Sequence, residues 1–437
     1  MRKIWKRTWL AGAALALAWL LGGCAAPSSA ESLFTLPRLP IEYTDLSRQI
    51  NELFDQGYEY ASPSSGRNIQ SVQMVDLDGD GDEEAVAFFR NRGNDEKPLK
   101  IFIFRANDDT YEQLCTVESS GTGVDSVFYQ DLTGDGKLEL VVGWRISSEV
   151  QTVAAYEIGP EPVMLMQSGY VRYSIEELDG DGVPSLLIFR LNDEGNSVAE
   201  FYSWSSEKMS VSFSTNLSGT MAELARGSVV SGRLSGRQAA VFVTGVTEEN
   251  MAATDIITYR EGQGLVNLAL NSQTGSSRIV YPYMQLRPQD INNDGVTDVP
   301  CPRADEDGQL SGLVDWMDVN GESEDSLVMT TYHHVGGGWY FVVPVDWANS
   351  IQVNNTEHGI NEVQTMLLLN GDPVGTIYTL TGENRENRAL RGNRIVLKRQ
   401  TGTIYAAELY AAGERYGLTE ELLRQNFRLI SNQWISG

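Results

Sequence analysis

Three short acidic segments hold the residues best suited to chemistry. They read DLDGDGDEE at 76–84, DLTGDGKLE at 131–139 and DINNDGVTD at 290–298. Each places oxygen-bearing side chains at its first, third, fifth and ninth positions, with Gly at the sixth. Calcium prefers about six to eight oxygen ligands, and four side chains with one backbone carbonyl supply most of that set. The spacing therefore predicts three calcium sites, in which the cation also offsets repulsion between the carboxylates.

An EF-hand is the nearest alternative, and the residues around the loops argue against it. An EF-hand requires a bidentate Glu at position twelve and a helix on each side. The three loops have Ala87, Val142 and Cys301 there, and their flanks are β-branched and aromatic. Position four is Gly79, Gly134 or Asn293, residue types that tolerate a left-handed backbone. We therefore expect tight loops that join strands.

The loops belong to a longer repeat. Together with two weaker copies they begin at Asp76, Asp131, Glu177, Arg233 and Asp290, at steps of 55, 46, 56 and 57 residues. An apolar stretch precedes each loop and a β-rich stretch such as EAVAFF or LELVVGW follows it. Three or four strands per unit, repeated about five times, predict a mainly β fold: a β-propeller of about five to seven blades.

The pattern D-x-D-G-D-G-x-x-[DE] between strands resembles the FG-GAP or VCBS repeats of integrin-α-type propellers. The resemblance covers roughly residues 66–345 and implies one calcium per loop, within a blade. It assigns the first site to Asp76, Asp78, Asp80, Glu84 and the Asp82 carbonyl; the second to Asp131, Thr133, Asp135, Glu139 and the Lys137 carbonyl; and the third to Asp290, Asn292, Asp294, Asp298 and the Val296 carbonyl.

The two weaker copies depart from this pattern. The segment at 177–185 offers Glu177, Asp179 and Asp181 but has Ser185 at the ninth position, so metal binding there stays open. The segment near 233 carries Arg233 and Arg237 where the acids belong. We expect no metal there, and expect guanidinium hydrogen bonds to hold the loop instead. The alternative for all five is a set of acidic surface turns without ions.

The N-terminus predicts export. A basic head and a short apolar run end in Leu21-Gly22-Gly23-Cys24, which resembles a bacterial lipobox. We expect residues 1–23 to be a signal peptide, Cys24 to carry lipid, and the protein to be extracytoplasmic on a bacterial membrane. An uncleaved membrane anchor is the alternative. Residues 24–65 read as a Ser- and Pro-rich tether and a short helix over 45–56, capped by Thr44 or Asp45.

The C-terminal part differs in composition. After about residue 345 the repeat ends, and residues 346–437 predict a separate α+β domain with a helix that begins after Thr419. The chain has a formal net charge of -26, and almost all of this excess precedes residue 346. So acidic a chain lacks the clustered cations that nucleic-acid binding needs.

One basic cluster interrupts the acidity. It comprises Arg385, Arg388, Arg391, Arg394, Lys398 and Arg399. The first three residues step by three, as on one face of a helical turn. The cluster is a candidate contact for anionic lipid, a wall polymer or an acidic protein. The alternatives are a solvated face and an internal contact with the acidic repeat.

Catalytic residues are scarce. The histidines are His333, His334 and His358, and the first two are adjacent, as at a hairpin end. Cys115 and Cys301 read as buried and inert thiols, although a disulfide between them stays open. We therefore expect non-catalytic binding of an extracellular protein or polysaccharide. The alternatives are a carboxylate-dependent glycan hydrolase or lyase, and an accessory subunit of a membrane complex.

Overall fold

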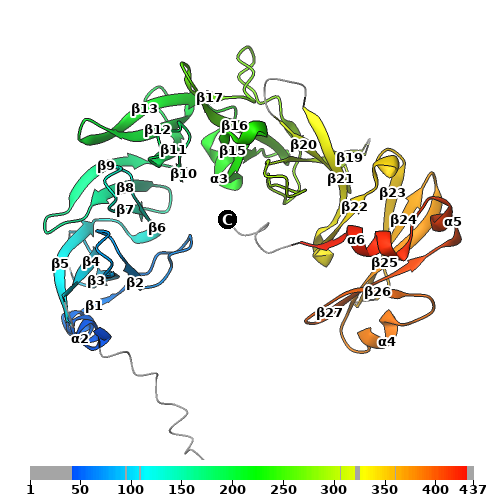
Figure 1. The fold of residues 1–437 in the computed structure, drawn as a ribbon, viewed down its shortest axis with the longest axis horizontal. Helices are drawn as coiled ribbons and strands as arrows, with labels where there is room; N and C mark the ends of the chain where they lie inside the picture. Colours follow the sequence, from blue (N-terminus) through cyan, green and yellow to red (C-terminus); the bar gives the residue numbers. More distant parts are fainter. Residues whose placement is uncertain are drawn as a thin grey trace, which may run out of the picture.

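The computed structural model describes residues 42–93, 96–107, 110–305, 307–319, 325–359 and 361–430. Its fold is mainly β: six antiparallel sheets follow one another in chain order along an open arc (Figure 1). The predicted signal peptide and Cys24 lie outside the described residues. Within the described part, no helix has the length and apolar character needed to cross a bilayer.

The first three sheets contain the strands β1 to β13. The first sheet holds β1 (Tyr58–Tyr60), β2 (Val72–Val75), β3 (Glu84–Asn91), β4 (Leu99–Asn107) and β5 (Thr110–Ser119). The second holds β6 (Gly123–Gln130), β7 (Glu139–Arg145), β8 (Gln151–Glu157) and β9 (Val163–Gly169). The third holds β10 (Arg172–Glu176), β11 (Ser185–Leu191), β12 (Ser197–Ser205) and β13 (Lys208–Asn216).

The remaining sheets contain β14 to β28. The fourth holds β14 (Ser228–Arg233), β15 (Ala239–Val246), β16 (Met251–Arg260), β17 (Gly264–Asn267) and β18 (Val280–Pro282). The fifth holds β19 (Val299–Ala304), β20 (Leu310–Asp318), β21 (Ser326–His334), β22 (Trp339–Val343) and β28 (Phe427–Leu429). The sixth holds β23 (Ile351–Glu357), β24 (Glu362–Leu369), β25 (Asp372–Thr381), β26 (Ile395–Gln400) and β27 (Thr403–Leu409).

In each of the first four sheets, one strand is apolar on both faces because both faces are covered; these strands are β3, β7, β11 and β15. In β3, Val86 and Phe88 pack toward Val142 and Trp144 of the second sheet. The alternate β3 residues, such as Phe89, pack against α2 (Glu42–Asp55). Separate apolar cores of the same kind join the second sheet to the third, the third to the fourth, and the fourth to the fifth. The uninterrupted apolar runs after the loops therefore encode strands sandwiched between sheets.

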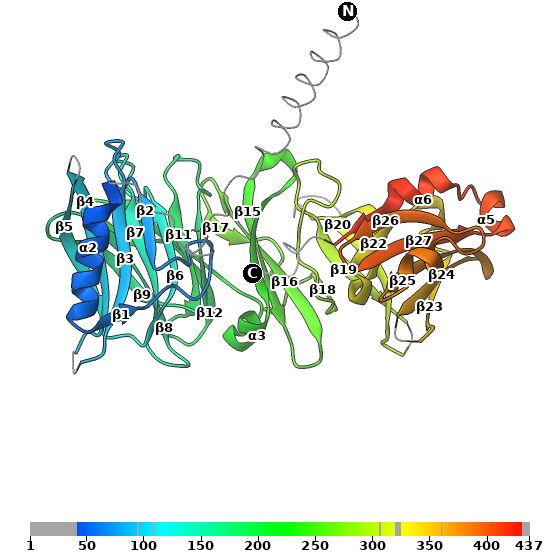
Figure 2. The same cartoon turned by 90° about the horizontal axis from the view of Figure 1, so that it is seen from below.

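Helix α2 covers the outer face of the first sheet, at the end of the arc (Figure 2). The predicted helix is confirmed; of the expected apolar face of Leu46, Ile50, Leu53 and Phe54, the first three are buried, whereas Phe54 is exposed. The predicted cap is wrong, because Asp45 already lies inside the helix. Its carboxylate instead accepts the Tyr111 amide at 3.1 Å, which ties α2 to β5.

The predicted boundary at residue 345 falls inside one continuous core. Trp339 and Phe341 of the fifth sheet pack with Ile377 and Tyr405 of the sixth. Helix α6 (Glu420–Asn426) begins after Thr419, whose hydroxyl accepts the Leu422 amide at 3.1 Å, as predicted. The helix is shorter than its apolar pattern predicts, because Phe427 already belongs to β28, which pairs with β22 of the fifth sheet.

The paired histidines lie at a hairpin end, as predicted. Strands β21 and β22 pair antiparallel across η3 (Val335–Gly337). The His333 ring stacks on Tyr340 with centroids 5.1 Å apart, and the His334 ring stacks on Trp339 at 5.4 Å. Both thiols are free: Cys115 is buried and Cys301 half-buried, and burial raises the pKa of Cys115 to about 11.

Candidate functional site: acidic loops and an inner cleft

In the first three sheets, the acidic loops connect neighbouring antiparallel strands: β2 to β3, β6 to β7, and β10 to β11. In the first three sheets, the residue before the loop pairs with the ninth loop residue: Val75 with Glu84, Gln130 with Glu139, and Glu176 with Ser185. The last loop repeats this register through a bridge between Gln289 and Asp298. The expectation of loops between strands is therefore confirmed, and the EF-hand alternative is excluded.

The first position fixes the turn of each complete loop. The two carboxylate oxygens of Asp76 accept the amides of Gly79 at 2.8 Å and Gly81 at 3.0 Å. Asp131 accepts the amides of Gly134 at 2.7 Å and Gly136 at 2.9 Å. Asp290 does the same with Asp294 and Gly295. The fourth residue has a positive φ in every loop: 76° at Gly79, 77° at Gly134 and 62° at Asn293. A tight left-handed turn thus brings the acidic side chains together.

The ninth position carries a buried carboxylate in each complete loop. Glu84, Glu139 and Asp298 are at most 1% exposed. One oxygen of each accepts the amide of the second loop residue, at 2.9 Å from Leu77, 2.7 Å from Leu132 and 3.2 Å from Ile291. Burial, together with repulsion from nearby acids, raises the pKa of all three carboxyls. The pKa of Glu139 rises to about 7 and that of Asp298 to about 6. A cation bound beside these carboxyls would lower their pKa.

Several loop oxygens have no hydrogen-bond partner in the described part of the chain. At the ninth position these are Glu84 Oε1 and Asp298 Oδ1. At the third position they are Asp78 Oδ1, Thr133 Oγ1 and Asp179 Oδ1, in three different loops. Recurrence at equivalent positions indicates a common ligand, because buried polar atoms are ordinarily satisfied.

The loops differ in how far their acids converge. Asp76, Asp78 and Glu84 offer oxygens within 4.8 Å of one another, and so do Glu177, Asp179 and Asp181 of the loop that lacks a ninth carboxylate. No such group of three acids forms among the described residues of the loops at 131 and 290. At the third position these loops have Thr133 and Asn292, which are not acids. The Asn292 amide nitrogen donates to Asp294 Oδ2 at 2.8 Å.

The fifth position is partly engaged within each loop. Asp80 Oδ1 and Asp135 Oδ1 accept the amides of Asp82 and Lys137, each at 2.9 Å. Asp181 and Asp294 accept the equivalent amides of Val183 and Val296. Asp80, Asp135 and Asp181 use one oxygen in these bonds, whereas Asp294 also accepts from Asn292 at its second oxygen. The roles assigned to the carbonyls of Asp82, Lys137 and Val296 stay predictions.

Arg105 in β4 is a contact that the sequence analysis missed. Its Nη2 donates to Asp78 Oδ2 at 2.9 Å, and its Nε lies 3.9 Å from Glu84 Oε1. Arg105 lies near the end of β4, the neighbour of β3 in the sheet, and follows Asp78 by 27 residues, so no local spacing connects the two. It partly neutralises the carboxylates of the first loop.

The loop near 233 closes in a different way. Arg233 pairs with Ala239, so only Leu234–Gln238 lie between the strands. Leu234 donates its amide to Gln238 at 2.8 Å, and Arg237 to Leu234 at 3.0 Å. The expectation that guanidinium groups hold this loop is wrong. Among the hydrogen bonds of the described residues, backbone bonds close this shorter turn.

Neighbouring loops contact one another. The Leu138 amide of the second loop donates to the Leu77 carbonyl of the first at 2.8 Å. A Cβ added to Gly134 would lie 2.9 Å from Cγ2 of Val183 in the third loop. Farther along the arc, the Thr297 amide donates to the Arg233 carbonyl at 2.8 Å. Three pairs of successive loops are therefore in contact or close proximity: the loops at 76 and 131, at 131 and 177, and at 233 and 290.

The basic cluster does not form one exposed face. Helix α4 (Arg385–Ala389) ends before the cluster does. Arg388 and Arg394 are 13% and 11% exposed in their side chains and both pair with Glu362, at 3.5 and 3.0 Å. Arg394 also lies over the Tyr378 ring, 3.5 Å from its centroid. These two residues are internal contacts of the sixth sheet. Arg385 is half-buried, whereas Arg391, Lys398 and Arg399 are exposed.

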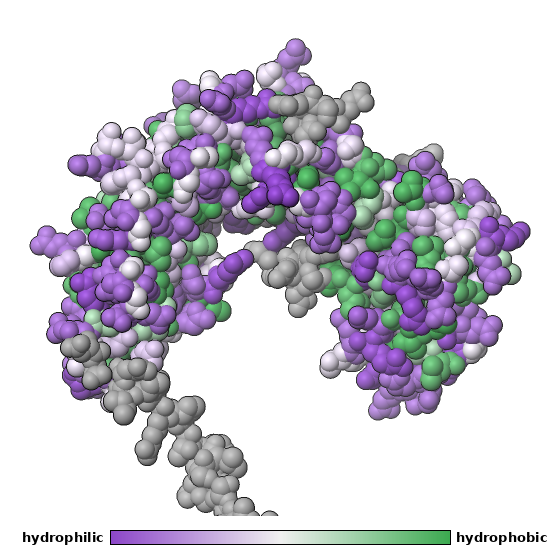
Figure 3. All heavy atoms as spheres, in the orientation of Figure 1, coloured by the Kyte–Doolittle hydropathy of each residue, from purple (hydrophilic) through white to green (hydrophobic). Residues whose placement is uncertain are grey.

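A cleft lies between the inner strands of the second, third and fourth sheets. Figure 3 shows the arc hollowed on its concave side, with hydrophilic residues around the hollow. The cleft has a volume of about 350 Å³ and is lined by residues of β6, β10 and β14 together with Arg287. Of the described residues that line it, only Asp125 is a carboxylate. Both Asp125 oxygens are engaged, by Tyr170 at 3.1 Å and by Arg145 at 3.2 Å.

Comparison with known proteins gives structural similarity only. No family model matches the chain, and no curated protein matches it. Similar solved structures include a hypothetical protein from Leishmania major, with 13% identity, a TM-score of 0.22, and coverage of 63% of this chain and 92% of that one. Another is an exo-beta-1,3-galactanase from Phanerochaete chrysosporium with beta-1,3-galactotriose, with 8% identity, a TM-score of 0.25, and coverage of 82% and 91%. At these scores the similarity carries no argument about function.

Proposed function

We propose that this protein is a calcium-stabilised β-propeller of the FG-GAP/VCBS-repeat kind that binds a protein or polysaccharide without catalysis. We further propose that the lipid-modified Cys24 holds it on the outer side of a bacterial membrane. Each successive sheet represents one blade in this proposal. The fold supplies a rigid frame, and the binding role comes from the cleft on its concave side.

One observation carries the calcium assignment. Ninth-position carboxylates that are at most 1% exposed keep an oxygen without a hydrogen-bond partner in the described part of the first and last loops. In the first loop Glu84 offers an oxygen within 4.8 Å of oxygens of Asp76 and Asp78. Hard oxygen donors in a tight loop fit calcium, whereas the absence of thiol or imidazole disfavours softer metals. Asp76, Asp78, Asp80 and Glu84 would hold the first ion.

The proposed role of calcium is structural. A cation at each loop would neutralise the carboxylates and hold in register the two strand segments that the loop connects. Because the loop at 131 contacts the loop at 76 through the Leu138–Leu77 bond, an ion in either loop would also stabilise the contact between the first two sheets. A ligand bound only by the folded state adds stability in proportion to RT ln(1 + [L]/Kd).

The cleft favours binding over hydrolysis. A glycosidase pair requires two carboxyl groups about 5–9 Å apart in the pocket. Asp125 is the single carboxylate among the described lining residues, and both of its oxygens accept hydrogen bonds. A second acid therefore does not face it across the cleft in this part of the chain. We accordingly prefer the binding function.

Two measurements test this proposal. Calorimetric titration with calcium should give three or four sites per chain, one fewer in Asp78→Ala, and no change in Arg233→Ala. A Cys24→Ala variant expressed in a bacterial host should leave the membrane fraction. Zero calcium sites, or retention of Cys24→Ala in washed membranes, would refute the corresponding half.

A further inference from the structure

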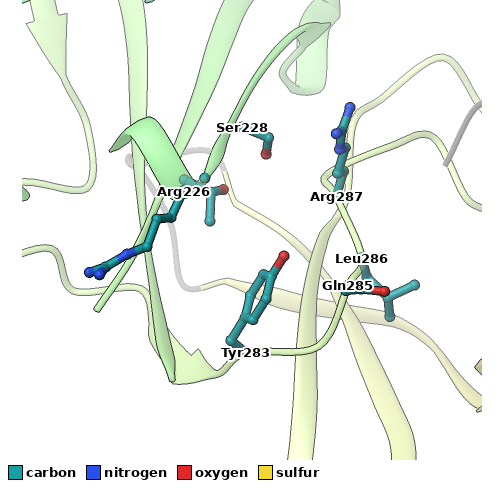
Figure 4. A pocket seen from close by; sticks show the side chains of 8 residues that line it. Arg226, Ser228, Tyr283, Gln285, Leu286 and Arg287 are labelled. Atoms are coloured by element: carbon teal, nitrogen blue, oxygen red, sulfur yellow. The ribbon is translucent and has the colours of Figure 1, made fainter. Parts of the chain in front are cut away.

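The cleft continues into a second hollow of about 120 Å³ on the side of the fourth sheet. The two hollows share Gly227, Ser228 and Arg287, so they form one site. Figure 4 shows the smaller hollow, with Ser228 on one side and with Tyr283 and Arg287 on the facing segment 283–287. Together the hollows suit a ligand of one or two rings.

Arg287 lacks the partners that other arginines of this cleft have. Arg172 donates to the carbonyl of Ala225 at 2.8 Å, and Arg226 donates to that of Val246 at 3.0 Å. No hydrogen bond or ion pair of the Arg287 guanidinium occurs among the described residues, although the residue is half-buried. The chain has 59 acidic and 33 basic residues, so an arginine without an acid here is available to a ligand. A guanidinium presents a planar set of donors that matches a carboxylate.

The opposite wall combines aromatic rings with hydroxyl groups. Tyr170 and Tyr173 meet edge to face, with centroids 4.9 Å apart, and Phe128 packs on Tyr173 at 5.8 Å. The Tyr173 hydroxyl bonds to Ser126 at 2.8 Å, and Tyr170 to Asp125. Aromatic rings suit the apolar C–H face of a sugar, while hydroxyls and Asp125 suit its hydroxyl groups.

The net charge limits how anionic the ligand is. A protein with a formal charge of -26 repels a densely charged polyanion at long range. One guanidinium among aromatic and hydroxyl groups instead fits a single carboxylate on a mostly neutral molecule. A saccharide with one acidic sugar meets this description better than an acidic peptide, whose flexible chain offers no rigid ring for the aromatic wall.

We propose that this cleft binds a uronic-acid residue of a saccharide, with its carboxylate on Arg287. This inference rests on the proposed binding function and specifies its ligand class. The carboxylate lies at the junction of the two hollows, and the sugar ring lies toward Tyr170 and Tyr173. Ser228 and Tyr283 are positioned to bond the remaining hydroxyl groups.

A matched pair of disaccharides tests the proposal. Cellobiouronic acid and cellobiose differ in one carboxylate, and calorimetry should show the acid binding the full chain at least about tenfold more tightly, as one charge-assisted contact predicts. Arg287→Gln should abolish this preference. Arg287→Lys should keep part of it, because the charge remains without the planar fork. Arg391→Gln removes the same charge from an exposed position of the basic cluster and should change nothing.

Each contrary result has a distinct meaning. Equal affinity for the two disaccharides, no binding of the acid at millimolar concentration, or full binding by Arg287→Gln would overturn the inference. So would a tripeptide with a central glutamate that binds as tightly as the acid. The calcium response of each variant's melting verifies its fold. Cleavage of the disaccharide would instead overturn the non-catalytic function while leaving the ligand class intact.

Discussion

The hairpins at 76–84 and at 233–239 occupy the same place in their sheets but close differently. In the first, Val75 pairs with Glu84 and eight residues lie between, held by the Asp76 carboxylate. In the other, Arg233 pairs with Ala239 and backbone bonds close a shorter turn. The hairpin at 233–239 contains no carboxylate, so it needs no counter-charge. Where the acids are lost, the turn is shorter, as expected if the longer loop serves the calcium site proposed for it.

Calcium removal should produce the largest effect and should separate the two kinds of hairpin. A site at a hundredfold excess of calcium over Kd adds about 2.7 kcal/mol to the free energy of unfolding. With several sites, a chelator should lower the melting temperature by more than about 5 °C. Hydrogen exchange should increase in β3, β7 and β19 but remain nearly unchanged in β15. Identical melting in calcium and in chelator would contradict this expectation.

Removal of one ligand should have the next largest effect. Asp78→Ala deletes an unpartnered oxygen and the Arg105 contact, and we expect it to reduce stability in calcium by about 2–3 kcal/mol, the contribution of one site. In chelator the loss should be much smaller. Arg233→Ala is the control in the other hairpin and should lower stability equally little in both buffers. Denaturant titration with and without calcium measures the difference, and equal losses for Asp78→Ala in both buffers would count against a metal there.

A pair of glycine substitutions separates loop geometry from contacts between loops. Gly134 and Gly236 have nearly the same φ, 77° and 79°, so alanine incurs the same left-handed strain of about 1 kcal/mol at both. Only at Gly134 would the new Cβ meet a neighbour, Val183 at 2.9 Å. We expect Gly134→Ala to cost about 1–2 kcal/mol more than Gly236→Ala, through overpacking. Equal costs in urea unfolding would show that the neighbouring loops do not constrain each other.

The smallest effect should come from the sixth sheet, which has no acidic loop. Burial alone would raise the pKa of the Glu362 carboxyl, but bonds from Gln364 and Arg394, and the charges of Arg394 and Arg388, outweigh it and lower the pKa. The stability gained is therefore present above the unfolded pKa and is lost as pH falls through the lower folded value. Glu362→Gln should cost about 1–2 kcal/mol at pH 7, equally with and without calcium.

The pH dependence supplies the check for this variant. As pH falls through the lowered pKa of Glu362, the wild-type carboxyl protonates, so the difference between wild type and Glu362→Gln should shrink. Thr365→Ser, a nearby substitution without charge, should show no such trend in the same acid titration. A difference that stays constant from pH 7 to pH 3 would mean that the Glu362 charge does not contribute.

Local spacing determined the hairpins, the glycine positions and the buried ninth carboxylates, because all the atoms concerned lie within nine consecutive residues. It also determined α2 and the start of α6, whose apolar periods and cap are local. The helical face predicted for Arg385, Arg388 and Arg391 does not form, because α4 ends at Ala389 and Arg388 turns inward to Glu362, more than twenty residues away.

Only the tertiary structure decided which distant residues meet. Arg105 reaches Asp78 across a sheet, Val183 fills the space beside Gly134, and β28 returns to β22 across the predicted boundary. Arg287 faces the cleft because the segment after β18 crosses the inner edge of the fourth sheet. These contacts depend on how sheets stack, and stacking is set by the apolar cores between them. Spacing along the chain carries no record of that arrangement.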